Sequence, residues 1–218
     1  MSDILEELIG RQFEIARGEA EALPLPRFDT YTICNLRGGI GKTSLAFNLA
    51  YLADEILAVD TCPQCNLSWF FDNNYLQNVQ LTVYDMLLPH FVPGLGSASR
   101  IAKSIAATND FFEGKRAFYL PSDNHLYILP SQIATAMVQA QRMAGSLQES
   151  IIDAMLFSLR DDIRREMRET GTKRCIIDTS PFFSGATHLS WHACDAMIIP
   201  VRTDQQSINS LTLLIKTL

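Results

Sequence analysis

A glycine-rich segment near residue 40 constrains this 218-residue sequence most, because closely spaced glycines interrupt regular structure and permit tight turns. The segment reads Asn35-Leu-Arg-Gly-Gly-Ile-Gly-Lys-Thr-Ser44. Residues 31–36 before it form a short apolar run, and residues 43–53 after it carry apolar side chains at helical spacing. Brief runs that are apolar on both faces are typical of buried strands. The sequence therefore predicts a strand, a tight loop and a helix in immediate succession.

The composition of this loop favours phosphate as its ligand. Glycines let backbone N–H groups converge on phosphate oxygens, and the helix that follows adds partial positive charge. Lys42 is placed to reach the outer phosphates of a nucleotide, and the Thr43 hydroxyl is placed to ligate Mg²⁺. The ordinary motif G-x-x-x-x-G-K-[ST] is not met, because its first position falls on Leu36. A glycine turn without a ligand is the alternative. The predicted nucleotide-binding residues are Gly38, Gly39, Ile40, Gly41, Lys42, Thr43 and Ser44.

Short apolar runs alternate with helical patterns along the rest of the chain. This alternation predicts an α/β fold in three layers, a mostly parallel twisted sheet flanked by helices. The runs interpreted as strands are residues 31–36, 56–60, 126–129, 175–178 and 196–201, with residues 117–120 as an additional edge strand. Helical periodicity marks residues 43–53, 83–88, 133–144 and 151–169, and residues 89–99 are interpreted as a surface loop.

Several of these segments together resemble one protein family. Residues 37–44 resemble the deviant Walker A loop, K-G-G-x-G-K-T-[ST], of the ParA/MinD group of P-loop ATPases. Further motifs of the family are matched in order by residues 58–66, 82–88, 126–131, 175–181 and 195–201. The resemblance covers residues 31 to about 215, and Pro63, Gln64 and Asn66 make it specific to the partition branch. It implies a P-loop NTPase fold with ATP and Mg²⁺ as cofactors.

The resemblance also implies roles for individual residues. In that family a lysine before the glycines reaches across a nucleotide-sandwich dimer to the partner's phosphates, and Arg37 holds this position here. Catalytic roles are therefore expected for Arg37, Lys42 and Asp60. Asp60 and Asp178 both end predicted strands, where carboxylates meet in the ligand crevice of a parallel sheet. With Thr43 they are the predicted Mg²⁺ ligands, although either aspartate alone is equally compatible with a structural cap.

One position departs from the family pattern in a way that bears on chemistry. Cys62 stands where the family has the aspartate that is thought to orient the attacking water. Since a neutral thiol is a poor base, we expect ATP binding with slow hydrolysis, that is, a weak ATPase. Cys62 and Cys65 also form a C-x-x-C, and with His188 and His192 they would make a zinc site. We favour the alternative in which the cysteine pair and the histidine pair do not come together.

The chain divides by composition into two parts. Residues 1–30 read as an acidic amphipathic helix that ends at Pro24 and Pro26, followed by a linker, and residues 31–218 as the nucleotide-binding domain. The helix is expected to pack on this domain or on a partner subunit. Members of the family usually continue with a further strand and helix, so we expect this last unit to be lacking.

Charge and hydropathy limit the function classes. A net charge of −6 argues against a domain whose main role is to coat nucleic acid. The basic residues of segment 160–174 alternate with acidic ones, which suits a solvated helix face better than DNA contact. No apolar run approaches the length of a membrane span, and the N-terminal residues lack the features of a signal peptide, so a cytoplasmic protein without membrane contact is predicted.

The sequence leads to one main hypothesis and two rivals. The resemblance implies a partition or positioning ATPase that switches between monomer and ATP-bound homodimer, with a ParB-like protein and nonspecific DNA as partners. One rival is a degenerate, non-hydrolysing regulatory module, which Cys62 motivates. The other is a metal or redox sensor built on Cys62 and Cys65.

Overall fold

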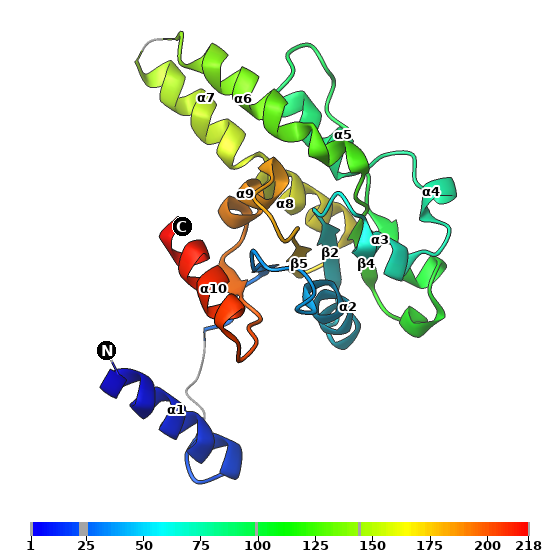
Figure 1. Cartoon of the computed structure of the whole chain (residues 1–218). Helices are drawn as coiled ribbons and strands as arrows, with labels where there is room; N and C mark the ends of the chain where they lie inside the picture. Colours follow the sequence, from blue (N-terminus) through cyan, green and yellow to red (C-terminus); the bar gives the residue numbers. More distant parts are fainter. Residues whose placement is uncertain (1, 22–25, 99, 144, 218) are drawn as a thin grey trace.

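The computed structural model describes residues 2–21, 26–98, 100–143 and 145–217, with backbone alone for residues 2–6, 8 and 9 (Figure 1). Its centre is a sheet with the strand order β3-β4-β2-β5-β1-β6. All pairings are parallel except that of β3 with β4. The strands are β1 (Thr30–Ile33), β2 (Ile56–Asp60), β3 (Lys103–Ser104), β4 (Ala117–Leu120), β5 (Arg174–Asp178) and β6 (Ala196–Ile198).

Helices cover both faces of this sheet, as the α/β prediction requires. The α-helices are α1 (Ser2–Arg17), α2 (Lys42–Leu52), α3 (Asn66–Phe71), α4 (Tyr75–Asn78), α5 (Val83–Leu87), α6 (Leu129–Ala140), α7 (Ser146–Leu156), α8 (Ser158–Thr170), α9 (Gly185–Ala193) and α10 (Gln205–Thr217). Short 3₁₀ turns lie at Leu88–His90, Ile105–Ala107, Asp110–Phe112 and Asn124–Tyr127. Within the described segments no helix is long and apolar enough to cross a membrane.

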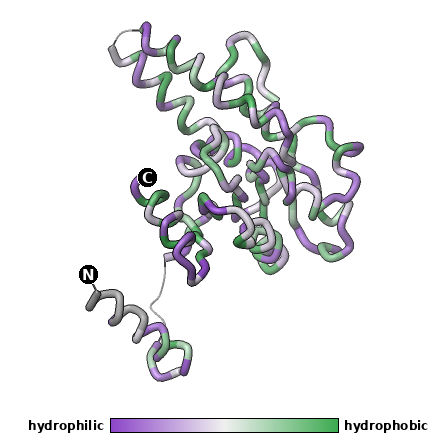
Figure 2. Tube along the Cα trace, viewed as in Figure 1, coloured by the Kyte–Doolittle hydropathy of each residue, from purple (hydrophilic) through white to green (hydrophobic). Residues whose placement is uncertain are grey.

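Strand β2 shows how the sequence specifies two cores at once. All five of its residues are buried, because successive side chains point to opposite faces of a sheet that is covered on both sides. Leu57 and Val59 pack with residues of α5, α6, α8 and α9, whereas Ile56 and Ala58 pack with residues of α2 and α3. Hydrophobic and hydrophilic residues alternate along α6 and α7 in Figure 2, as expected for helices with one solvated face.

The structure corrects three sequence predictions. Residues 126–129 are not a strand: they lie in the 3₁₀ turn Asn124–Tyr127 and at the start of α6. Leu126 and Leu129 are both fully buried, three residues apart, so the apolar run reflects helical spacing. Residues 117–120 form a strand, but not an edge strand, because β3 pairs with its outer side. The pattern over 151–169 is divided between α7 and α8, which meet at Phe157.

The N-terminal helix is present, but its predicted end at the prolines is wrong, because residues 18–21 are already outside the helix. Helix α1 ends at Arg17, well before Pro26. Phe13 is 59% exposed, so this member of the apolar stripe does not pack on the domain. Pro24 and the side chains of Leu5, Leu8 and Ile9 lie outside the described residues.

Candidate nucleotide-binding site

The glycine-rich loop lines a cavity of about 230 Å³ at the carboxyl edge of the sheet. All seven residues predicted to bind nucleotide contribute to it. The remaining wall comes from the segments that follow β2 and β5, namely Cys62, Gln64, Asn66, Thr179 and Pro181. The strand–loop–helix prediction is therefore correct, and the structure brings this loop together with the ends of two neighbouring strands.

Glycine is required in this loop by backbone conformation. Gly39 and Gly41 have φ angles of +69° and +89°, a region that side chains with a Cβ rarely adopt. Gly41 directly precedes α2, and its carbonyl accepts the N–H of Leu45 at 2.8 Å. Apart from the adjoining residues of the chain, no atom of the described segments lies within 4 Å of where a Cβ would stand on either glycine. The space over the loop is therefore open to a ligand.

Lys42 is held inside the loop by carbonyl oxygens. Its Nζ donates to the carbonyl groups of Asn35 and Arg37, each at 3.0 Å, and the residue is 7% exposed. Burial lowers the pKa of the ammonium group, while the nearby Asp178 raises it. Because both acceptors are neutral dipoles, a phosphate oxygen is a stronger partner for this ammonium group. The arrangement suits exchange of a carbonyl contact for a phosphate contact.

Thr43 and Asp178 form a pair that fits a divalent cation. The Thr43 hydroxyl donates to Oδ2 of Asp178 at 2.7 Å, and Asp178 is fully buried. The other oxygen, Oδ1, has no hydrogen-bond partner among the described residues. Burial, together with the neighbouring Asp60, raises the pKa of Asp178 to about 7. A buried carboxylate oxygen without a partner, next to a hydroxyl of the phosphate loop, offers the oxygen ligands that Mg²⁺ prefers.

Asp60 lies beside Asp178, but its oxygens are already engaged. The two residues are direct partners in the register of β2 and β5. Oδ1 of Asp60 accepts the N–H of Cys62 at 3.0 Å, and Oδ2 accepts the N–H and hydroxyl of Ser68 at 2.8 Å each. Burial raises the pKa of Asp60 to about 6. In this structure Asp60 anchors the loop after β2, and its role as a metal ligand or catalytic residue stays a prediction.

Ser122, just after β4, completes a closed ring of hydrogen bonds around this anchor. Its N–H donates to Oγ of Ser68 at 2.9 Å, and its hydroxyl donates to the carbonyl of Cys62 at 2.7 Å. With the three bonds that Cys62 and Ser68 donate to Asp60, every member of the ring is buried and bonded to two others. The ring fixes the backbone of Cys62 in the cavity wall.

The side chain of Cys62 is unsuited to acid–base chemistry. It is 4% exposed, and burial raises the pKa of its thiol to about 12. The thiol is therefore neutral at physiological pH. The structure gives no support to the zinc site: within the described residues there is no group of three or more His, Cys, Asp or Glu that would hold a metal ion. His188 and His192 instead face one another on α9, with ring centroids 4.8 Å apart.

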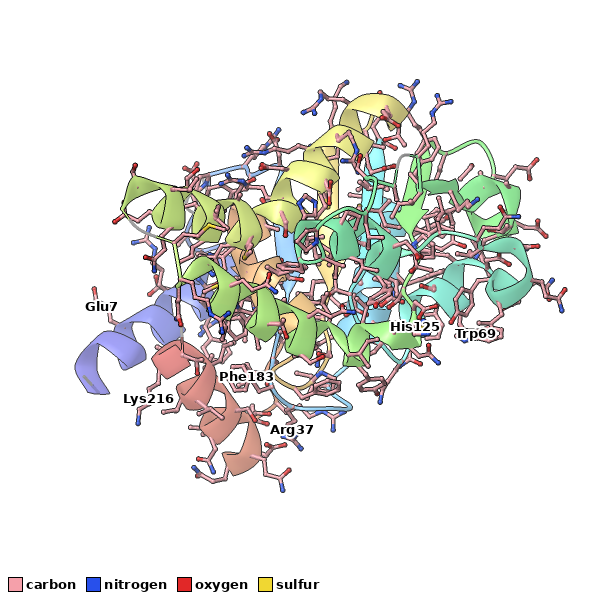
Figure 3. All side chains as sticks on the ribbon, turned by 90° about the horizontal axis from the view of Figure 1, so that it is seen from above. Glu7, Arg37, Trp69, His125, Phe183 and Lys216 are labelled. Atoms are coloured by element: carbon pink, nitrogen blue, oxygen red, sulfur yellow. The ribbon has the colours of Figure 1, made fainter. Side chains whose placement is uncertain are left out.

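Arg37, the residue expected to act across a dimer, contacts its own chain. Its guanidinium group pairs with Asp204 and donates to Oγ of Ser207 at 2.8 Å. Figure 3 shows the labelled Arg37 close to α10. Sequence reasoning missed Asp204 and Ser207. No signal in a single sequence links them to Arg37, because they lie 167 and 170 residues away along the chain.

The arginines of the basic segment 160–174 have two different environments. Arg165 pairs with the buried Asp162 at 2.6 Å, and Arg160 lies over the ring of Phe157. Arg164 and Arg168 instead line an open groove of about 530 Å³ at the end of α8. Part of this segment thus holds the fold together, and part of it faces solvent.

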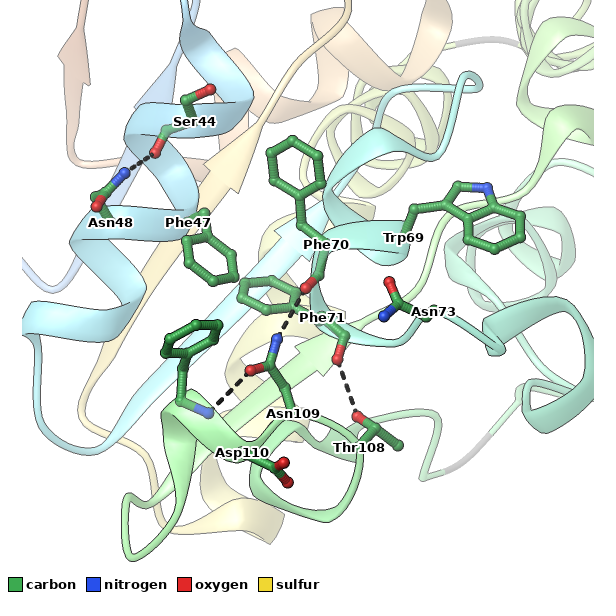
Figure 4. Close-up of a pocket in the computed structure, with 11 residues that line it drawn as sticks. Ser44, Phe47, Asn48, Trp69, Phe70, Phe71, Asn73, Thr108, Asn109 and Asp110 are labelled. Atoms are coloured by element: carbon green, nitrogen blue, oxygen red, sulfur yellow. Dashed lines mark hydrogen bonds between the residues drawn. The ribbon is translucent and has the colours of Figure 1, made fainter.

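A larger cavity, about 560 Å³, lies next to the phosphate loop (Figure 4). Four of its eleven lining residues are aromatic side chains of α2 and α3, and the lining residue Asn109 donates to the carbonyl of Phe70 at 2.9 Å. The residues lining it include Asp110 but neither lysine nor arginine. It lacks the cations that phosphate needs, so the smaller cavity is the candidate site.

Comparisons with known proteins agree with this assignment. A sequence model described as an AAA domain matches residues 29–218. The maintenance of carboxysome distribution protein A of Gloeothece citriformis is 26% identical over 84% of this chain, which spans 60% of that relative. A plasmid partition protein from Borrelia burgdorferi superposes with a TM-score of 0.58 at 15% identity, covering 88% of this chain and 72% of its own.

An enzyme shares the same fold. Cobyrinic acid a,c-diamide synthase from Mycobacterium smegmatis, with bound ATP analogue and magnesium, superposes with a TM-score of 0.60 at 18% identity. The match covers 88% of this chain and 67% of the synthase. At these identities the two solved structures demonstrate a common fold, and that fold carries nucleotide and magnesium in the synthase.

Proposed function

Because this chain belongs to the AAA domain family and is a P-loop ATPase of the ParA/MinD type, we propose that it binds Mg²⁺·ATP and uses it to position a cargo. The relative from Gloeothece citriformis is named for the maintenance of carboxysome distribution, and the Borrelia neighbour is a plasmid partition protein. Positioning is the activity common to both names.

One observation carries the nucleotide assignment. Lys42 and an open glycine loop line one cavity, and Thr43 of the same lining donates to Asp178, whose second buried oxygen has no hydrogen-bond partner among the described residues. The loop amides and Lys42 would hold the phosphates, and Thr43 and Asp178 would hold Mg²⁺. When bound, the cation supplies positive charge where the phosphates carry negative charge.

Titration calorimetry tests this assignment directly. Mg²⁺·ATP injected into the wild-type chain should give saturable binding, and Lys42→Ala should weaken it by about 100-fold or more, because a charged hydrogen-bond partner of phosphate is lost. Lys216→Ala is the matched control, since this lysine is exposed on α10. Absence of binding by the folded wild-type chain would refute the proposal.

We further propose that nucleotide controls self-association. The candidate site is open on the side of Gly39 and Gly41, where the nearest protein atoms leave space above the loop. A second copy that binds there would shield the phosphates and bring its own Arg37 to them, as the family resemblance implies. Sedimentation velocity with Mg²⁺·ATP and with Mg²⁺·ADP tests this: a dimer is expected with ATP alone.

Hydrolysis is proposed to be slow because Cys62 offers no base. The neutral, buried thiol cannot take a proton from water near pH 7. Cys62→Asp should raise the rate of phosphate release, whereas Cys62→Ser, which is similar in size and also neutral, should not. If the aspartate variant binds ATP and releases no more phosphate than the serine variant, Cys62 does not limit the rate.

DNA is a proposed partner of the ATP-bound state. The groove lined by Arg164 and Arg168 is the exposed basic surface that this proposal uses, because phosphate backbones bind such groups without sequence preference. A ParB-like partner protein is proposed on the family resemblance alone. An Arg164→Ala and Arg168→Ala double variant should lose DNA binding in a salt-dependent assay while retaining ATP.

The non-hydrolysing regulatory module remains the second candidate, and the neutral thiol of Cys62 favours it. The two candidates differ in turnover. Phosphate release above background with Mg²⁺ and DNA, lost in Lys42→Ala, supports the ATPase. Tight ATP binding with no release under any of these conditions supports the module.

A further inference from the structure

The segment after β6 is attached to the phosphate loop at several points. The side-chain amide of Asn35 donates to the carbonyl of Pro200 at 2.9 Å. The guanidinium group of Arg202 donates to the carbonyl of Gly39 at 2.7 Å. These contacts join residues that are separated by more than 160 positions. The start and the middle of the loop are therefore both fastened to segment 200–207.

Arg37 makes the third attachment, and Asp204 organises it. Oδ1 of Asp204 accepts both the Arg37 guanidinium and, at 2.8 Å, the N–H of Ser207. Oγ of Ser207 accepts from Arg37 at 2.8 Å and from the N–H of Arg202 at 3.1 Å, and Ser207 is fully buried. The carboxylate of Asp204 thus caps the first turn of α10 and binds Arg37 at the same time.

This contact competes with the role expected of Arg37 in a dimer. A guanidinium group binds carboxylate and phosphate through the same N–H donors, in the same forked geometry. The terminal nitrogen of Arg37 that contacts Asp204 also contacts Ser207, so it is fully engaged within its own chain. Arg37 must leave Asp204 before it can turn that nitrogen toward a phosphate on another molecule.

We propose that Asp204 is a positioning residue that holds Arg37 on its own chain and releases it to the nucleotide of a second copy of this chain. This inference rests on the proposed function, since it needs an ATP-dependent dimer. It adds the element that opposes dimer formation: the monomer is favoured until a bound nucleotide offers Arg37 a stronger anion than the Asp204 carboxylate.

The size of the effect follows from exposure. The side chains of Arg37 and Asp204 are 20% and 41% exposed, so the ion pair is partly solvated and of modest strength. Removing this ion pair should raise the equilibrium constant for release of Arg37 from residue 204 by about twofold to fivefold in each chain. A symmetric dimer releases two such contacts, so its dissociation constant should fall by about 4-fold to 25-fold.

The test uses Asp204→Asn in the full chain. Asparagine also caps helices well, so the first turn of α10 should be retained while the charge is lost. Asp204→Glu restores the charge and should return the dissociation constant toward the wild-type value. Asp153→Asn, an exposed change on α7, is the control for loss of one negative charge. Ser207→Ala weakens the hold on Arg37 without changing any charge, and it replaces Asp204→Asn if that variant does not fold.

Dimer dissociation constants are measured by sedimentation with Mg²⁺ and a non-hydrolysable ATP analogue, and analogue binding is measured separately by calorimetry. The proposal predicts tighter dimers for Asp204→Asn, wild-type behaviour for Asp153→Asn, and no effect of Asp204→Asn when Arg37 is already alanine. If the wild-type chain dimerises and Asp204→Asn leaves the constant unchanged or raises it, Asp204 does not restrain Arg37. If neither chain binds the analogue or dimerises, the proposed function fails, and this inference with it.

Discussion

Replacing Asp178 with asparagine should make the stability of the nucleotide-free protein less sensitive to a rise in pH from acid to neutral. The carboxyl group of Asp178 is fully buried, and burial raises its pKa to about 7, far above that of an aspartate in an unfolded chain. Between these two pKa values the folded protein binds a proton that the unfolded chain has lost. The free energy of unfolding therefore falls as pH rises from about 4 to about 7.

The magnitude follows from this shift. For a folded pKa of about 7 and an unfolded pKa of about 3.9, raising the pH from 5 to 8 removes about 2–3 kcal/mol of stability. An amide in place of the carboxyl group does not titrate, and its oxygen still accepts the Thr43 hydroxyl. Between pH 5 and pH 8, the free energy of unfolding of the wild-type protein should therefore fall by about 2 kcal/mol relative to that of Asp178→Asn.

Urea unfolding at pH 5, 6, 7 and 8 measures the difference. The expected result is a wild-type stability that declines with pH relative to that of Asp178→Asn. Calorimetry of the same variant should show weaker binding of Mg²⁺·ATP, because one cation ligand is lost. Parallel pH profiles for the two proteins would refute the reasoning, since they would mean that Asp178 has the same pKa in the folded and unfolded chains.

Two further predictions concern a glycine of the phosphate loop and a buried glutamate. Gly41→Ala should lower stability by about 1 kcal/mol, since alanine is strained at a φ of +89°, and should weaken ATP binding; an unchanged urea midpoint would contradict this. Glu166→Ala should cost about 2–3 kcal/mol of stability, because it leaves the N–H groups of Ile101 and Ala102 without the carboxylate that accepts them. Glu166→Gln should retain part of that stability. Equal losses in both variants, measured from urea unfolding curves, would argue against this role of the carboxylate.

The regular part of the fold was predictable because its pattern is unambiguous. Ile56–Asp60 was predicted with its observed bounds, since a run that is apolar on both faces fits a strand covered by two helical layers. Residues 126–129 show where this reasoning fails. A four-residue apolar run does not distinguish a strand from two helical positions that face the core, and Leu126 with Leu129 is the second case.

Some features of the candidate site were also predictable from the sequence, and others were not. The seven loop residues and Asp178 were predicted because glycines, a lysine and strand ends leave local patterns in the sequence. The engagement of Asp60 by Ser68, and of Arg37 by Asp204, was not predicted. Both depend on how side chains are oriented in three dimensions, and a spacing of 167 residues carries no signal about contact.

Two segments contact the phosphate loop or its cavity and are held differently, because the ring of Asp60, Cys62, Ser68 and Ser122 supports the segment after β2 and not segment 200–207. On the ring's side, a shift of any one member breaks buried hydrogen bonds, so that wall is already rigid before anything binds. On the other side, segment 200–207 is joined to the loop by hydrogen bonds of Asn35 and Arg202 and by the partly solvated pair of Arg37 and Asp204, which is the weakest kind of contact among them. When a ligand binds, we therefore expect displacement of segment 200–207 and α10, while the segment held by the ring keeps its position.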